Sequence, residues 1–194
     1  MRTPSEAIGD ILCRIESTTH VDRVPLAQAL RRVLARDAVA DVDLPPFEKS
    51  AMDGFAVRST DFVGPNSPRR LRRIGESKAG APFEGTLQPG ECVEIYTGAE
   101  LPRECDAVVM VEHSKNAGEA GEHILLEGSA PRGQHVCHVG EDLRSGATVL
   151  MAGRRLSPID LSVLAAVGCQ PVPVFRRPRV ALLTTGDELV AADA

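Results

Sequence analysis

The sequence predicts a mixed α and β protein built from more than one domain. Amphipathic patterns with helix-capping residues occur near the N-terminus and again at residues 157–168. Between them, residues 47–132 hold short apolar runs separated by Gly and Pro clusters, which is typical of an all-β domain. A continuous apolar run at residues 180–183 is typical of a strand buried on both faces of an α/β sheet.

The N-terminal third predicts two short helices and a strand. Thr3 and Glu6 have the spacing of a capping box, and Pro4 stands where the first turn of a helix tolerates proline. Apolar residues follow at helical spacing: Ile8, Ile11, Leu12 and Ile15. A second amphipathic helix is predicted after Pro25, with one apolar face made of Leu26, Leu30, Val33 and Leu34. A strand with alternating apolar and acidic residues then ends at Pro45, which cannot donate to a sheet and marks a domain boundary.

The C-terminal third predicts a turn and strand at residues 140–153, and then a helix. Ser157 is its expected N-cap, with Pro158 in the first turn, Asp160 three residues after the cap and Gly168 as the stop. The apolar run and a polar turn follow. A strand buried on both faces needs partner strands and covering helices, which residues 191–194 are too few to supply. We therefore expect the sequence to stop just after the first strand of a truncated α/β domain.

The composition of the chain limits the kinds of molecule that we expect it to bind. The 194 residues include 22 Lys and Arg against 27 Asp and Glu, a net charge of −5, and only 3% are aromatic. Neither a phosphate-neutralising surface nor base-stacking platforms are evident, so we expect no nucleic acid partner. The N-terminal segment lacks the apolar stretch of a signal peptide, and no apolar run reaches the roughly 18 residues of a membrane helix. These patterns predict a cytoplasmic protein with no membrane partner.

Two further clusters each have a plain interpretation and a functional one. His135, Cys137 and His138 could begin a zinc site, but a closed site wants four ligands and no second pair follows, which favours ordinary strand residues. The basic run "RRLRR" at residues 69–73 is interpreted as a solvated strand face rather than an anion site.

Polar residues in four glycine-containing segments are the candidate functional residues. Asp53 lies in "PPFEKSAMDGFAV", where flanking apolar residues would hold its carboxylate at a partly desolvated surface; the alternative is a simple Asp-Gly turn. Thr97 of "YTGA" and Asp142 of "GED" each stand beside a glycine that permits close approach of a ligand. The segment "TTGDEL" follows the last apolar run and offers the hydroxyls of Thr184 and Thr185 and the carboxylates of Asp187 and Glu188. Ligands bind at the carboxyl ends of such strands, although acids also favour the first turn of a helix.

These segments, taken together and in order, resemble the molybdopterin molybdenumtransferase family, known as MoeA in bacteria and as the E domain of gephyrin and its plant relatives. The resemblance extends over nearly the whole chain, whereas full-length members are about twice as long. It rests on four segments: "PPFEKSAMDGFAVR", "PGECVEIYTGAELPRECDAVVMVE", "GEDLRSGATVLMAGRRLSPIDLSVLAAVG" and "RPRVALLTTGDELV".

The resemblance implies a fold and an activity. It implies an elongated, multi-domain homodimer, with a discontinuous helical and strand linker domain (residues 1–44 and 134–170), an inserted β domain (45–133) and the start of a truncated molybdopterin-binding α/β domain (171–194). The implied reaction of molybdenum cofactor biosynthesis inserts molybdate into adenylylated molybdopterin, with Mg2+-dependent release of AMP.

The resemblance also implies site residues. Asp53, Thr97, Asp142 and Glu188 match the family's catalytic polar groups, and Thr185, Gly186 and Asp187 match substrate-binding positions. Asp53 and Glu188 are the implied metal ligands, because a cation can bridge carboxylates to a pyrophosphate or an oxyanion.

Two functions therefore remain open. The chain is an enzyme fragment that is inactive without the missing domains, or it is a non-catalytic dimerisation or scaffold module from the same family. A reading frame that continues past Ala194 into Gly-rich α/β sequence would favour the first, and a stop codon there would favour the second.

Overall fold

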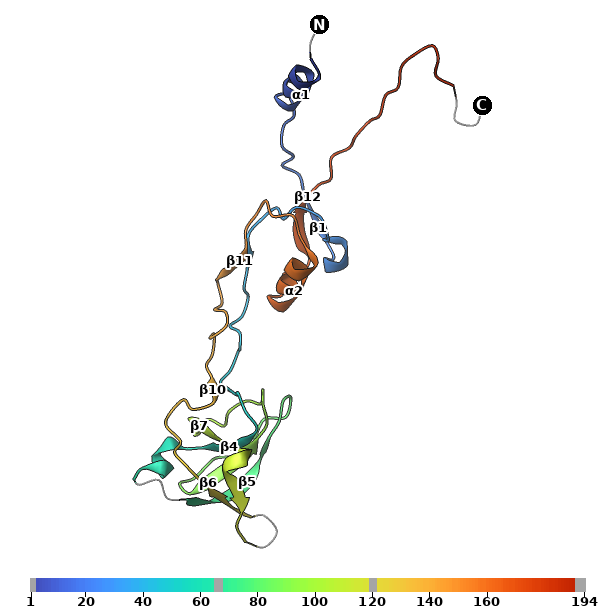
Figure 1. The fold of residues 1–194 in the computed structure, drawn as a ribbon. Coiled ribbons are helices and arrows are strands. Elements are labelled where there is room, and N and C mark those ends of the chain that lie inside the picture. Colours follow the sequence, from blue (N-terminus) through green and yellow to red (C-terminus); the bar gives the residue numbers. More distant parts are fainter. Residues whose placement is uncertain (1–2, 65–67, 119–121, 191–194) are drawn as a thin grey trace. The chain divides into compact units, whose positions relative to one another are not determined.

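The fold is mixed, and it consists mainly of β-strands (Figure 1). The computed structural model describes residues 3–64, 68–118 and 122–190. The chain divides into two compact units: residues 1–39 with 148–194 form one, here called the terminal unit, and residues 40–147 form the other, the β unit. The predicted domain limits at residues 45, 134 and 171 stay a prediction.

The terminal unit contains the two α-helices of the described chain. Helix α1 covers Pro4–Leu12 and α2 covers Pro158–Ala166. Both begin with the predicted capping box: the side chains of Thr3 and Ser157 accept from the backbone N–H three residues later, and the acid at that position accepts in return. None of the described helices combines the length and the apolar character that crossing a bilayer requires.

Two small antiparallel pairs hold the terminal unit together. Strand β1 (Val21–Val24) pairs with β12 (Val172–Phe175), and β2 (Ala38–Val39) pairs with β11 (Thr148–Leu150). Side chains from these strands, from α2 and from the segments between them form one apolar core: Val24, Ala29, Leu34, Ala38, Leu150, Leu156, Leu164, Val172 and Val174.

The predicted second helix after Pro25 is wrong. Only a single 3-10 turn, Leu26–Gln28, forms there, and Arg31 then adopts a φ of 62°. Beyond Arg31 the backbone is extended: the Val33 carbonyl accepts from Phe175 N–H at 2.8 Å, and Leu34 N–H donates to Arg154 at 2.9 Å. Leu34 is fully buried in this extended path, so pairing with distant segments overrides the local helical pattern.

The strand predicted at residues 180–183 does not form in this structure. The chain from Arg176 to Gly186 has no helix or strand, and Val180, Leu182 and Leu183 are 77%, 92% and 92% exposed. A strand needs a neighbour to satisfy its N–H and C=O groups, and none of the described residues pairs with this one. The predicted polar turn after it does form, with Leu189 N–H donating to the Gly186 carbonyl at 3.1 Å.

The β unit confirms the prediction of an all-β middle region. Its described strands form a sheet in the order β7-β4-β6-β5-β9-β8. Figure 1 labels β4, β5, β6 and β7 of this sheet. The strands are β4 (Gly54–Val57), β5 (Arg69–Ser77), β6 (Glu91–Ile95), β7 (Ala107–Met110), β8 (Ser114–Asn116) and β9 (His123–Leu126). Neighbours are antiparallel except for β5 and β6. The short strands β3 (Lys49–Ser50) and β10 (Val136–Cys137) pair beside it.

The central strands of this sheet are buried on both faces. All four residues of β4 are buried, with Phe55 and Val57 in one apolar cluster and Ala56 in another. Because side chains alternate along a strand, the two clusters lie on opposite faces of the sheet. Strand β4 therefore gives the residues that precede it, including Asp53, a firmly held anchor.

Replacement of Asp160 tests the cap of α2. Its buried carboxylate accepts from Ser157 N–H and Oγ, both at 2.8 Å, and from Arg154 Nε at 3.0 Å. The Ser157 N–H and the Arg154 guanidinium lower the pKa of Asp160 from 3.8 to about 2. A carboxyl whose pKa is lower in the folded chain than in the unfolded chain stabilises the fold at pH values above its unfolded pKa. For Asp160 this stabilisation is lost as the pH falls from 3.8 through about 2.

We expect Asp160→Asn to lower the free energy of unfolding by about 1–2 kcal/mol at pH 7, since the charge-assisted bonds weaken. The difference from wild type should shrink as the pH falls through about 2. Urea unfolding at a series of pH values measures it, with the exposed Asp187→Asn as the control. An unchanged difference between pH 7 and pH 2 would contradict the role given to the charge.

Candidate active site

The site is built on the loop between β3 and β4, which holds Ala51, Met52 and Asp53. Three backbone hydrogen bonds tie this loop to other segments. Ala51 N–H donates to the His135 carbonyl at 2.9 Å, and the Asp53 carbonyl accepts from Val111 N–H at 3.0 Å. Ahead of the loop, Gly98 N–H donates to the Ser50 carbonyl at 2.8 Å. The loop is therefore fixed on both sides.

Ser50 is a residue of this site that the sequence alone did not single out. It is buried, its hydroxyl donates to the Met52 carbonyl at 2.5 Å, and the same oxygen accepts from Met52 N–H at 3.2 Å. One side chain thus satisfies both backbone groups of Met52 and sets the bend of the loop. A serine whose hydroxyl bonds the backbone two residues later is a known turn-forming pattern. The serine of "SAMDG" was therefore the sequence signal from which this role could have been predicted.

Gly54 follows Asp53 for a reason other than turn formation. It is the first residue of β4, paired with Ile95 on one side and with Met110 on the other. A Cβ added to Gly54 would lie 2.0 Å from the Val109 carbonyl oxygen. The close approach of β4 and β7 therefore requires glycine here. The interpretation of this dipeptide as a simple Asp-Gly turn does not describe it.

Asp53 and Thr97 are in direct contact, although 44 residues separate them in the sequence. The Asp53 Oδ1 atom accepts from the Thr97 backbone N–H at 2.7 Å and from the Thr97 hydroxyl at 2.8 Å. Thr97 lies just after β6, in a turn closed by Ala99 N–H donating to the Tyr96 carbonyl at 2.9 Å. Gly98 in this turn has a φ of 83°, which favours glycine. Two of the four predicted catalytic residues are thereby brought together.

This contact sets the charge and the direction of the carboxylate. The Thr97 backbone N–H, followed by its hydroxyl, lowers the pKa of Asp53 below its ordinary value. Asp53 is exposed, and both bonds use Oδ1, so Oδ2 makes no hydrogen bond to the described residues. The arrangement presents one oriented, ionised carboxylate oxygen to solvent. Such an oxygen can bind a hard cation or accept a proton from water.

The apolar frame predicted around Asp53 is only partly present. Phe55 and Val57 are buried in the sheet, as a frame requires, whereas Phe47 and Met52 are exposed. The loop is held by backbone hydrogen bonds and by Ser50 instead. Three exposed side chains lie next to this pair. Met52 and Tyr96 directly precede Asp53 and Thr97 in the sequence, and Val111 donates its backbone N–H to the Asp53 carbonyl.

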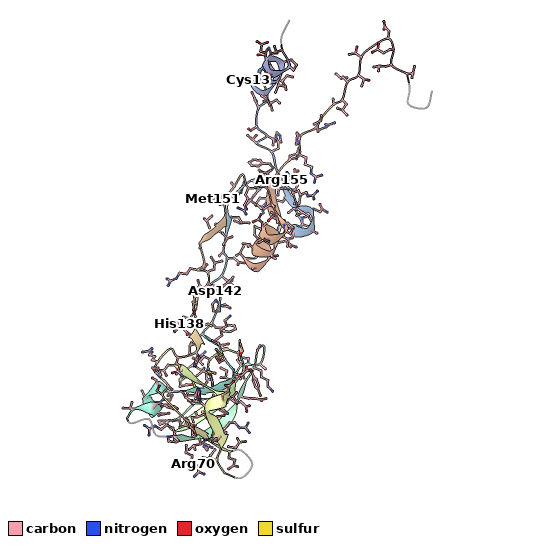
Figure 2. The ribbon with its side chains drawn as sticks, viewed as in Figure 1. Cys13, Arg70, His138, Asp142, Met151 and Arg155 are labelled. Atoms are coloured by element: carbon pink, nitrogen blue, oxygen red, sulfur yellow. The ribbon has the colours of Figure 1, made fainter. Side chains whose placement is uncertain are left out.

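Asp142 lies elsewhere in the β unit, on the paired segments that Figure 2 shows running beside its label. Two backbone hydrogen bonds join these segments. Leu44 N–H donates to the Leu143 carbonyl at 2.7 Å, and Asp142 N–H donates to the Leu44 carbonyl at 2.9 Å. The side chain is exposed. No hydrogen bond or ion pair within the described chain joins Asp142 to Asp53 or Thr97.

The last predicted residues belong to the terminal unit. Thr185, Gly186, Asp187 and Glu188 lie on its exposed C-terminal segment, with Asp187 and Glu188 in the turn that follows Gly186. The two predicted metal ligands, Asp53 and Glu188, thus stand in different units. Within residues 3–64, 68–118 and 122–190, no group of three or more His, Cys, Asp or Glu side chains is arranged to hold a metal ion.

Of the other two clusters, the basic run takes its plain interpretation as a strand face, whereas only part of the His135–His138 run is strand, because His135 lies in a turn with a φ of 55°. Val136 and Cys137 form β10, and His138 pairs with Glu48, its Nδ1 lying 2.9 Å from Oε2 (Figure 2 labels His138). The five cysteines are free thiols. The basic run forms the start of β5, where Arg72 pairs with Glu91 and Arg73 pairs with Glu94 at 2.5 Å. These arginines are largely neutralised by neighbours on β6.

Known proteins resemble the chain over nearly all of its length. It is 36% identical over 195 residues to a molybdopterin molybdenumtransferase of Bacillus subtilis, covering 97% of this chain and 45% of the relative. It is 39% identical over 170 residues to molybdopterin molybdenumtransferase 2 of Mycobacterium tuberculosis H37Rv, covering 87% of this chain and 41% of the relative. The chain thus spans less than half the length of these curated relatives.

A solved structure agrees with the fold. The molybdopterin biosynthesis MoeA protein from Pyrococcus horikoshii superposes with a TM-score of 0.80 at 34% identity, over 90% of this chain and 46% of that one. The family model described as the MoeA N-terminal region, domains I and II, matches residues 2–168. Because this model matches more than half of the chain, the chain belongs to the MoeA N-terminal region family.

Proposed function

We propose that this chain forms the N-terminal part of a molybdopterin molybdenumtransferase. In this reaction of molybdenum cofactor biosynthesis, molybdate is inserted into adenylylated molybdopterin and AMP is released in a Mg2+-dependent step. The names of the relatives support the reaction class, and the direct contact between Asp53 and Thr97 supports a chemical role for this unit. Because the chain covers 45% of the first relative, the complete site requires further residues.

The residues around Asp53 fit a magnesium ion as partner. Mg2+ is usually bound through one or two carboxylates together with substrate phosphates and waters, rather than by a dedicated protein cage. Asp53 offers one such carboxylate: it is exposed, its pKa is lowered, and Oδ2 is free of hydrogen bonds to the described chain. When bound, the ion would neutralise phosphate charge during hydrolysis.

Asp53 itself has two tasks in this proposal. Its negative charge lowers the energy of a cation beside the pyrophosphate, and its free oxygen can accept a hydrogen bond from the attacking water and so orient it. Thr97 acts on Asp53 rather than on the substrate. By donating twice to Oδ1, it keeps the carboxylate ionised and fixes the direction of Oδ2.

The other matched positions complete the proposal. Asp142 and Glu188 are proposed as further catalytic acids, with Glu188 as the second metal ligand. Thr185, Gly186 and Asp187 are proposed to contact substrate. Gly186 has a φ of 150° and the carboxylate of Glu188 folds against it, so a side chain at this position would meet that carboxylate. The match of these positions to the family's motifs supports these roles.

The function is tested on the complete product of the gene that encodes this chain. Purified protein is incubated with adenylylated molybdopterin, molybdate and MgCl2, and AMP and molybdenum cofactor are quantified by chromatography. We expect release of AMP that requires Mg2+ and formation of cofactor that requires molybdate. Protein that binds the substrate yet releases no AMP under any of these conditions would contradict the proposal and favour a non-catalytic module.

The second candidate, a dimerisation or scaffold role, is favoured by the apolar face of α1. Ile8, Ile11, Leu12 and, just beyond the helix, Ile15 are exposed, and α1 has no buried residue. An apolar stripe of this kind is typical of a surface that another chain covers. We propose a homodimer, in which an isologous contact would place the same stripe on both sides.

Changes on α1 test the homodimer. We expect the wild-type chain to sediment as a dimer at tens of micromolar, and Ile8→Gln with Ile11→Gln to shift it towards the monomer by at least about tenfold in dissociation constant, since two apolar side chains leave the contact. The control is Ile159→Gln on α2, another exposed isoleucine. Equal weakening in the control, or a monomeric wild type, would contradict this role of α1.

A further inference from the structure

The terminal unit contains a pocket of about 530 Å3 that no proposed catalytic residue lines. It lies where three segments meet: the stretch before β1, the extended residues after Ala29, and the chain that leaves β12. The segments are held together by Arg176 N–H donating to the His20 carbonyl at 2.9 Å and by Phe175 N–H donating to the Val33 carbonyl at 2.8 Å. A volume of this size suits a small molecule.

Positive charge dominates the pocket. Arg31, Arg32, Arg176 and Arg177 all line it. The carboxylate that offsets them is Asp22, which accepts from Arg32 Nη2 at 3.2 Å and from Arg176 Nε at 3.0 Å. Arg31 and Arg177 have no ion pair within the described chain. The pocket therefore attracts anions, in contrast to β5, where acidic neighbours on β6 pair with Arg72 and Arg73.

Arg32 adds a hydrogen-bond donor that no acceptor in the described part of the chain satisfies. Its side chain is only 11% exposed, and Nη2 also donates to the Phe175 carbonyl at 2.9 Å. The buried Nε–H, by contrast, finds no acceptor in the described chain. A buried donor without a partner is costly, so the protein's own acceptors leave this guanidinium incompletely satisfied.

Arg31 adopts a backbone conformation that arginine rarely takes. Its φ of 62° lies in the left-handed region, where Gly and Asn are far more common than long side chains. Its N–H donates to the Leu156 carbonyl at 2.9 Å, so the surrounding fold holds this conformation. Backbone strain of this kind is often kept where a side chain has a task beyond folding.

We propose that this pocket binds a small organic anion, with a phosphate or carboxylate group recognised by Arg31, Arg32 and Arg177 and the organic part placed against Phe175. Guanidinium groups match the geometry of these anions, and Val33 and Pro178 provide further apolar lining. Arg177 and Pro178 begin the exposed C-terminal segment, so ligand binding would also restrain that segment where it leaves the unit.

Calorimetric titration of the 194-residue chain with three probes tests the proposal. Phenyl phosphate offers the anion and a ring, inorganic phosphate offers the anion alone, and phenol offers the ring alone. We expect phenyl phosphate to bind saturably at one site, at least about tenfold more tightly than inorganic phosphate or phenol. Added salt should lower its affinity. Absence of saturable binding, or equal affinity for inorganic phosphate, would overturn the proposal.

Matched variants locate the binding. Arg177→Gln should weaken phenyl phosphate binding about tenfold or more by removing one charge-assisted contact, whereas Arg179→Gln removes the same charge two residues away, outside the pocket, and should leave affinity unchanged. Equal weakening by both would indicate a general charge effect and overturn the site.

Arg31→Asn distinguishes a binding role from a structural one. Asn adopts the left-handed region more readily, so we expect the melting temperature to hold or to rise by about 2 °C while affinity falls about tenfold or more. Unchanged affinity in Arg31→Asn would remove Arg31 from the site.

Discussion

Asp53→Asn is expected to reduce adenylate hydrolysis at least about a hundredfold in the complete gene product, which is the lower end for loss of a positioned acid–base group. The amide keeps an oxygen that can accept from Thr97, as Asp53 Oδ1 does at 2.7 and 2.8 Å, so the loop should keep its shape. What is lost is the negative charge beside the cation and the oriented oxygen for water. The measurement is the rate of AMP release at saturating MgCl2.

The control for this variant is Glu100→Gln, which removes an exposed carboxylate three residues after Thr97. We expect its rate and its thermal unfolding to match the wild type. Asp53→Asn should likewise unfold at the wild-type temperature, because an exposed residue contributes little to the core. A hydrolysis rate within a few-fold of wild type would show that Asp53 is only part of the scaffold.

Thr97→Val gives a finer test of how the pair works. It removes the hydroxyl bond to Asp53 and leaves the backbone N–H bond in place. The pKa of Asp53, lowered by both donors, should then rise towards its ordinary value. The acid limb of the pH–rate profile should move to higher pH, and Thr97→Ser, which restores the hydroxyl, should move it back. A profile that does not move would contradict the positioning role.

Gly54→Ala is expected to destabilise the β unit by about 3 kcal/mol, near the upper end for overpacking, because the obstacle is backbone rather than a movable side chain. The new Cβ would lie 2.0 Å from the Val109 carbonyl oxygen and 2.9 Å from Met110 Cα. Relief requires β4 and β7 to separate, which breaks their hydrogen bonds and shifts Asp53. Urea unfolding followed by far-UV circular dichroism measures the loss.

Gly98→Ala is the matched comparison in the neighbouring turn. Gly98 has a φ of 83° and open space where a Cβ would be placed, so alanine there should cost only about 1–2 kcal/mol of backbone strain. Gly54→Ala thus measures the cost of a steric clash, and Gly98→Ala measures the cost of a positive φ without a clash. A Gly54→Ala protein no less stable than Gly98→Ala would contradict the close β4–β7 approach.

The features that the sequence predicted correctly depend on local or repeated patterns. The caps of α1 and α2 use side chains three residues apart, Thr3 with Glu6 and Ser157 with Asp160, so their geometry follows from the helix itself. The all-β middle region followed from short apolar runs between turn residues. Asp53 and Thr97 were singled out as candidates because each stands in a long recognisable motif, and their functional role stays a prediction.

Other features depended on partners far away in the chain. The apolar pattern after Pro25 suits a helix, yet hydrogen bonds to Phe175 and Arg154 draw these residues into an extended path. The run at residues 180–183 has the composition of a strand, but strand formation depends on a neighbour, and the described chain provides none.

What the sequence by itself determined is thus the family, the helix caps, the β character of residues 47–132 and the identity of the main candidate residues. Only the tertiary structure decided that Thr97 binds Asp53, that Ser50 shapes the loop, that Gly54 is required by β7, and that arginines from both ends of the terminal unit line one pocket. The physical reason is the distance along the sequence between the residues that interact. Capping and turn preferences act within a few residues, whereas each of these other contacts, except that of Ser50, joins segments that only the folded sheet or core brings together.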